Sequence, residues 1–311
     1  MVKKASLVSM CVLLAWASSM AQTPPEEPKG AEDKVRFWAE RLKGDDQATL
    51  LKAVEELSRL TYKGAHSPIV KPQLTRIAEL LKHDKSEVRR PVISILINLK
   101  AKEYSQQIGE LLKDENDDVK KAAIGALEYF QATDYTGEIA KFLQHPNFGL
   151  RGTAVNALGT LGAKEHAEAM LKLLDDENSW VRGLTASALA KFGGDYAKDI
   201  ARLLKSKEND KINAIHALRH LKAKEYAAQI AGLLKDEDHG VRASALWALM
   251  ELGAKEHAGE IAQLLDDKND AVRKDAQSIL RAWKISPEEA NKLKSEDHPA
   301  GDEKKEAVAP P

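Results

Sequence analysis

Residues 223–253 read AKEYAAQIAGLLKDEDHGVRASALWALMELG, and the same pattern starts again at Ala254. Further copies start at Ala101, Ala132 and Ala163. One leucine late in each copy marks the period: Leu96, Leu127, Leu158, Leu189, Leu218, Leu249 and Leu280. Successive leucines are 31 residues apart, except for a step of 29 residues between Leu189 and Leu218. Self-similarity at a fixed period of this size predicts a repeat architecture.

Each copy contains two halves with apolar residues at three- and four-residue steps, which predicts two amphipathic helices. Polar residues three positions before the first apolar residue of the second half are expected to cap its N-terminus: Asn116, Asn147, Asn178, Asp238 and Asn269. A single helical hairpin cannot bury its apolar stripe, whereas stacked hairpins can. The sequence therefore predicts an all-α, right-handed solenoid of about eight two-helix repeats.

Four second halves open with Val-Arg: Val88-Arg89, Val181-Arg182, Val241-Arg242 and Val272-Arg273. Residues 157–162 end another second half as Ala-Leu-Gly-Thr-Leu-Gly. These motifs resemble the HEAT family, and more closely its short HEAT-like repeats of the bilin-lyase type. The resemblance covers residues 32–284. It departs from the pattern at an insertion around residues 64–68, and in the sixth repeat, which is two residues short and has Asp210 where valine is usual.

One repeat position is basic from the second repeat to the eighth: Arg89, Lys120, Arg151, Arg182, Lys211, Arg242 and Arg273. The HEAT resemblance implies that these residues pair with acidic turns and form a structural ladder between repeats. The acidic turns include Asp117-Asp118, Asp175-Asp176 and Asp266-Asp267. A row of anion-binding residues is the alternative.

The N-terminus has the features of a signal peptide over residues 1–21. Lys3 and Lys4 precede an apolar run, and Ser19 and Ala21 are small residues before a cleavage site at Gln22. The run at residues 7–20 is shorter than the roughly 20 residues of a membrane-spanning helix. We therefore expect export to the periplasm or the medium, with no membrane span.

The other flanks are expected to be a linker at residues 22–31, a short capping helix at 285–294 and a disordered charged tail at 295–311. Cys11 is the single cysteine and leaves with the signal peptide, so the mature chain has no thiol chemistry. Without Lys3 and Lys4, 45 basic residues face 48 acidic ones, a net charge of −3. Such a balance disfavours nucleic acid and anionic membranes as partners.

His216 and His220 lie four residues apart, which is a metal-ligand spacing, but a third ligand would have to come from another repeat, with Glu251 the nearest candidate. Two solvated histidines are the favoured interpretation. The sequence has no glycine-rich phosphate loop and no nucleophile elbow. We expect no catalytic residue, metal or cofactor.

In the second helices of repeats six and seven, large side chains are predicted to project from the concave face: Ile212, His216, Arg219, Trp247 and Met250. Tryptophan and arginine dominate binding energies at interfaces, so this face is predicted to bind a protein partner. The alternative places Trp247 in the core. In repeats four and five the equivalent positions are small, including Gly152, Gly159 and Gly183, which predicts a smooth open trough.

Two classes of function follow. The favoured one is an exported, monomeric HEAT-repeat scaffold that binds an unknown protein. The alternative is a HEAT-like enzyme or accessory lyase acting on a small ligand or a protein-bound cofactor.

Overall fold

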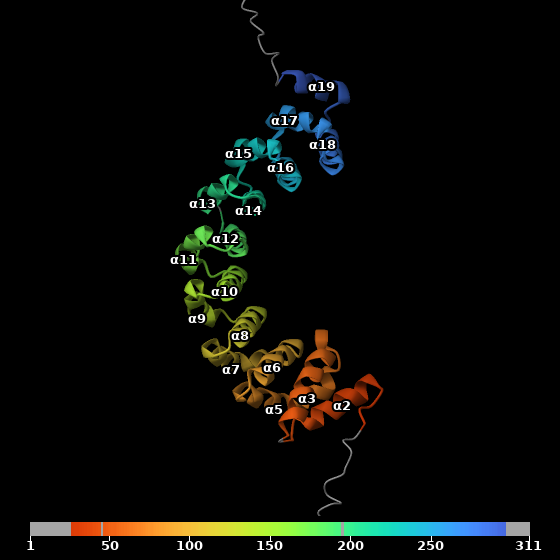
Figure 1. The fold of residues 1–311 in the computed structure, drawn as a ribbon, viewed down its shortest axis with the longest axis vertical. Coiled ribbons are helices and arrows are strands. Elements are labelled where there is room, and N and C mark those ends of the chain that lie inside the picture. The colour runs from red at the N-terminus through yellow and green to blue at the C-terminus, as the bar shows by residue number, and fades with distance from the viewer. Residues whose placement is uncertain (1–25, 45, 194–195, 297–311) are drawn as a thin grey trace, which may run out of the picture. The chain divides into compact units, whose positions relative to one another are not determined.

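A computed structural model describes residues 26–44, 46–193 and 196–296, and all regular structure within these ranges is helical (Figure 1). The predicted all-helical repeat solenoid is confirmed. The predicted signal peptide at residues 1–21, the first part of the predicted linker and residues 297–311 lie outside the described residues. No helix of the described residues is both long and apolar enough to cross a membrane.

The chain divides into two compact units between Gln107 and Ile108. In the first unit, α3 packs against both α2 and α6, and α2 also packs against α4. Its α-helices are α2 (Ala31–Arg41), α3 (Gln47–Leu60), α4 (Ser67–Val70), α5 (Leu74–Glu79) and α6 (Ser86–Asn98). Its 3-10 turns are η1 (Tyr62–Gly64), η2 (Lys71–Gln73), η3 (Leu80–Lys82) and η4 (Lys102–Tyr104), and α7 (Ser105–Glu110) spans the division. The predicted insertion forms the end of η1 and the start of α4.

In the second unit, the second helices of successive repeats pack on one another in chain order. They are α8 (Asp117–Tyr129), α10 (Phe148–Leu161), α12 (Ser179–Phe192), α14 (Glu208–His220), α16 (His239–Leu252) and α18 (Asp270–Ala282). These helices form one row, and the first helices form a second row beside it (Figure 1). The last helix, α19 (Pro287–Glu296), packs against α17.

In the second unit, the first helix of each repeat is divided, where the sequence predicted one helix. The α-helical parts are α9 (Thr136–Ala140), α11 (Ala167–Leu171), α13 (Ala197–Ala201), α15 (Ala227–Gly232) and α17 (Ala258–Gln263). The 3-10 turns around them are η5 (Leu111–Lys113), η6 (Thr133–Tyr135), η7 (Lys141–Gln144), η8 (Lys164–His166), η9 (Lys172–Asp175), η11 (Arg202–Lys205), η12 (Lys224–Tyr226), η13 (Leu233–Lys235), η14 (Lys255–His257) and η15 (Leu264–Asp266). Turns of this kind are common at helix ends. Each first helix therefore has only a short α-helical segment next to 3-10 turns.

All five predicted N-caps are confirmed. For example, Asn116 Oδ1 accepts from the backbone N–H groups of Asp118 and Val119, and Asp238 Oδ1 accepts from Val241 N. Asn147, Asn178 and Asn269 cap α10, α12 and α18 in the same way. These bonds satisfy N–H groups that have no partner within the helix.

Six of the described second helices also end in a common way: α6, α8, α10, α14, α16 and α18. After α16, Gly253 has a φ of 68°, and Ala254 N donates to Leu249 O at 3.0 Å. Lys222 adopts the same left-handed conformation after α14, with a φ of 55°. This C-terminal motif reverses the chain and directs it into the next repeat.

Candidate partner-binding site

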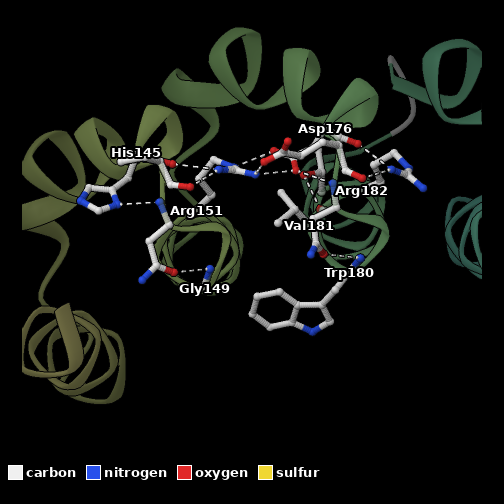
Figure 2. A network of polar contacts seen from close by, with 12 residues as sticks. His145, Gly149, Arg151, Asp176, Trp180, Val181 and Arg182 are labelled. Atoms are coloured by element: carbon white, nitrogen blue, oxygen red, sulfur yellow. Dashed lines mark hydrogen bonds and ion pairs between the residues drawn. The ribbon is translucent and has the colours of Figure 1, made fainter.

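Four of the recurring basic residues join successive repeats in the second unit: Arg151, Arg182, Lys211 and Arg242. Figure 2 shows this contact for Arg151. Arg151 Nε and Nη2 donate to the two carboxylate oxygens of Asp176, at 2.7 and 2.8 Å. Arg151 Nη1 donates to the carbonyl oxygens of His145 and Pro146, in its own turn. One guanidinium thus closes its own turn and holds the turn of the next repeat.

The same arrangement recurs later in the chain. Arg242 Nε and Nη2 donate to Asp267, both at 2.7 Å, and Lys211 Nζ lies 2.6 Å from Asp236. The side chains of Arg242 and Asp267 are only 4% and 6% exposed. Since these cations are engaged by carboxylates, the geometry favours the structural ladder over the alternative of anion binding.

The carboxylates of the ladder also accept backbone hydrogen bonds, which stabilise their charged form. Asp267 Oδ1 accepts from Asn269 N at 2.8 Å. Burial raises the pKa of the Asp267 carboxyl, but the hydrogen bonds from Arg242 and Asn269 outweigh burial and hold the pKa below its usual value. The pKa values of Asp176 and Asp236 are lowered by the same opposition of burial and hydrogen bonding. These groups are therefore charged at neutral pH.

The sixth repeat supplies its carboxylate from a different position. Asp236 follows Leu233-Leu234-Lys235 in the seventh repeat, whereas Ser206 follows Leu203-Leu204-Lys205 in the sixth. Asp210, on α14, takes over the pairing: Arg182 Nε and Nη2 donate to its Oδ2 at 3.0 and 2.7 Å. Asp210 is buried, and its Oδ1 has no hydrogen-bond partner among the described residues.

Two other basic residues of the predicted ladder pair with carboxylates of their own helices. Lys120 lies 2.9 Å from Asp117 of its own helix, and Arg273 pairs with Asp270 at 3.0 Å, also within its helix. Arg89 Nη1 donates to the carbonyl oxygens of His83 and Asp84 in its own turn.

The predicted partner-binding residues lie on α14 and α16, which pack against each other. His216 and Trp247 are exposed, and Ile212, Arg219 and Met250 are half-buried. Trp247 is 39% exposed, so it is not a core residue. We refer to these five residues as the tryptophan face.

Acidic residues that the sequence argument did not include hold two side chains of the tryptophan face. Arg219 Nη1 lies 3.1 Å from Glu251 Oε1, and Trp247 Nε1 donates to Asp275 Oδ2 on α18 at 3.2 Å. Glu251 had been weighed only as a metal ligand. Asp275 could have been found from its place one turn into the next second helix, where it faces the preceding repeat.

Comparison with known proteins identifies the repeat. The family model described as HEAT repeats matches residues 136–212 and 200–281. Residues 136–281 are HEAT repeats. HEAT repeats are commonly protein-interaction modules, and the tryptophan face lies within the matched segment.

The solved structures that are similar to this chain include crystal structures of two engineered proteins. One is 19% identical, with a TM-score of 0.53, and the match covers 84% of this chain and 81% of that one. The other is 20% identical, with a TM-score of 0.45 and coverage of 71% and 96%. The first likeness shows the fold alone. No curated protein matches the chain.

The small residues of the HEAT repeats do not form the predicted open trough. Gly152, Gly159 and Gly183 are all buried. A Cβ on Gly159 would lie 2.6 Å from Ala188 Cβ, and one on Gly183 would lie 2.3 Å from Asn213 Nδ2. The prediction was wrong because these positions face the next second helix, so glycine here allows close helix packing.

Gly152 is covered by Trp180, a residue for which the sequence predicted no role. A Cβ on Gly152 would lie 2.0 Å from Trp180 Cζ3, so the indole lies across the glycine. Trp180 is nevertheless 49% exposed, and Phe148 packs edge-on against it with ring centroids 6.4 Å apart. Trp180 directly precedes Val181, so helical periodicity could have placed it at the surface.

The two histidines of α14 remain without a third metal ligand. The described residues contain no group of three or more histidine, cysteine, aspartate or glutamate side chains that could hold a metal. Desolvation lowers the pKa of His216, the charge of Arg219 lowers it further, and Glu251 opposes both. His216 therefore presents a neutral imidazole at neutral pH.

Proposed function

We propose that the protein is an exported, non-catalytic HEAT-repeat scaffold that binds a protein partner through the tryptophan face. The observation that carries the proposal is the 39% exposure of Trp247 on a helix of a protein-interaction fold. Met250 and Arg219 lie beside it, and all three residue types are enriched at protein interfaces.

The contacts around Trp247 also favour binding. Its indole N–H is held by Asp275, and Arg219 is held by Glu251, so both side chains are oriented before a partner arrives. Immobilising fewer side chains on association reduces the entropic cost of binding. The face thus combines an apolar anchor with polar groups at its edge.

The Trp247→Ala variant tests this face once a partner has been isolated with the mature protein from its native host. The affinity should fall by about 2 kcal/mol, or roughly 30-fold, because a hot-spot side chain is lost. The melting midpoint should fall less than for a core tryptophan, because the side chain is 39% exposed and only part of its volume is buried. Titration calorimetry and a melting curve measure the two quantities.

Trp180→Ala provides the matched control, since Trp180 is exposed to a similar extent but lies on α12, outside the tryptophan face. This variant should keep the affinity of the parent protein. Equal loss of affinity in both variants, or a large drop in melting midpoint for Trp247→Ala, would remove the support for the face.

Export is proposed from the N-terminal pattern. Protein purified from its native host should begin at Gln22, and N-terminal sequencing measures this directly. A cytoplasmic chain that still begins at Met1 would contradict it.

A further inference from the structure

The first hairpin carries a pocket that neither the repeat ladder nor the tryptophan face uses. The pocket, about 350 Å³ in volume, lies between α2 and α3. Its lining residues are Glu27, Phe37, Trp38, Arg41, Ala48, Thr49 and Lys52. All of them belong to the first unit, so the pocket is defined without reference to the second.

One lining residue of this pocket, Trp38, has a buried donor that makes no hydrogen bond among the described residues. Trp38 is 4% exposed, and among the described residues no acceptor hydrogen-bonds its indole Nε1. A buried donor that is left unsatisfied is destabilising. An acceptor that entered the pocket and reached this N–H would remove that cost.

Two positively charged side chains lie next to Trp38, so the pocket favours an acceptor that is negatively charged. The Arg41 guanidinium lies 3.3 Å from the ring centroid of Phe37, and Lys52 Nζ lies 5.1 Å from the ring of Trp38. Among the described residues, neither cation has a carboxylate within ion-pair distance. An indole N–H and two cations fit an anionic oxygen acceptor.

The leader already brings one carboxylate to the edge of the pocket. Glu27 pairs with Lys34 at 3.3 Å. The hydrogen bond and charge of Lys34 lower the pKa of Glu27 against the effect of desolvation, and Trp38 and Lys52 lower it further. The Glu27 carboxylate therefore lies close enough to Trp38 to be stabilised by it, but the pair does not reach hydrogen-bond geometry at Trp38 Nε1.

We propose that this pocket binds a glutamate side chain of an acidic peptide segment, and that Glu27 of the leader occupies it weakly in cis. The peptide carboxylate accepts from Trp38 Nε1 and is paired by Arg41 and Lys52. Phe37 and the face of Trp38 contact the apolar part of the bound segment. The site is independent of the tryptophan face and does not rest on the function proposed above.

The test uses the mature chain with Glu26→Gln and Glu27→Gln, which removes the carboxylates of the leader. The probe is a synthetic peptide of the sequence QTPPEEPKG, identical to residues 22–30, and the control peptide has glutamine in place of both glutamates. The readout is the indole N–H resonance of Trp38 in a ¹H–¹⁵N correlation spectrum, assigned with the Trp38→Phe variant.

The acidic peptide should shift this resonance saturably, and the control peptide should not. The parent protein, with Glu27 present in cis, should bind the acidic peptide about tenfold more weakly. Lys52→Gln should weaken binding, whereas the matched exposed variant Lys71→Gln should not. No shift at saturating peptide, an equal shift with the control peptide, or an equal shift with the same concentration of sodium acetate would overturn the proposal.

Discussion

Replacing Asp267 with alanine should lower the free energy of unfolding by about 3–5 kcal/mol, because it leaves the buried Arg242 guanidinium without its carboxylate. Arg242 retains only the carbonyl oxygens of Asp236 and Glu237, which carry no full charge. The pair joins the seventh repeat to the eighth, and the stability of a repeat protein depends on such nearest-neighbour interfaces. Chemical denaturation measures the loss. Hydrogen exchange should show that the amides of α17 and α18 lose protection before those of other helices.

Two control variants separate the broken pair from the mere loss of charges. The double variant Arg242→Met/Asp267→Leu should recover most of the stability, since no buried charge is left alone. Lys141→Met removes an exposed pair with Glu138, 2.7 Å apart, and should leave the unfolding midpoint unchanged. Equal losses for Lys141→Met and Asp267→Ala would contradict the buried-pair argument.

The pH dependence provides a second check on the same pair. Because the pKa of Asp267 is lower in the folded protein than in the unfolded chain, its stabilisation is present above the unfolded value of about 4. It is lost as the pH falls through the lower, folded value. The difference in stability between the parent protein and Asp267→Ala should therefore be constant between about pH 5 and pH 8. The difference should shrink in more acidic solution.

The sequence predicted the helices and their caps because these depend on local chemistry. Asn116 and Asn269 cap their helices through N–H groups two and three residues away, so the residue type and its place before the apolar run were sufficient. The divided first helices were not predicted. An apolar stripe has nearly the same spacing in an α-helix and in the short 3-10 turns at its ends.

Surface positions were harder to assign, because exposure depends on the neighbouring repeat. Gly152 and Gly183 were predicted on the same exposed side of their helices as Trp247, but the next second helix buries both glycines. Helical periodicity gives the direction of a side chain but not the distance of the next helix. The sequence did not predict a role for Trp38, since neither its repeat position nor a motif marks the pocket beside it.

The second large effect is expected at Asp210, where the family pattern and the structure predict opposite signs. Valine occupies this position in other repeats, as Val181 and Val241, so Asp210→Val brings the sixth repeat closer to the common pattern. Burying valine contributes about 1.5 kcal/mol or more, and the unpartnered Oδ1 is removed. On the pattern alone, the variant should be more stable than the parent protein.

The structure predicts instead a net loss of about 2–3 kcal/mol in the free energy of unfolding, measured by chemical denaturation. Asp210 is the one carboxylate among the described residues that pairs with Arg182, whose side chain is 16% exposed, and breaking a pair this deeply buried costs about 3–5 kcal/mol. That cost exceeds the gain from valine. Arg182→Leu combined with Asp210→Val should return to within about 1 kcal/mol of the parent protein, because neither charge remains. An Asp210→Val variant with a raised midpoint would show that the shortened repeat does not depend on this pair.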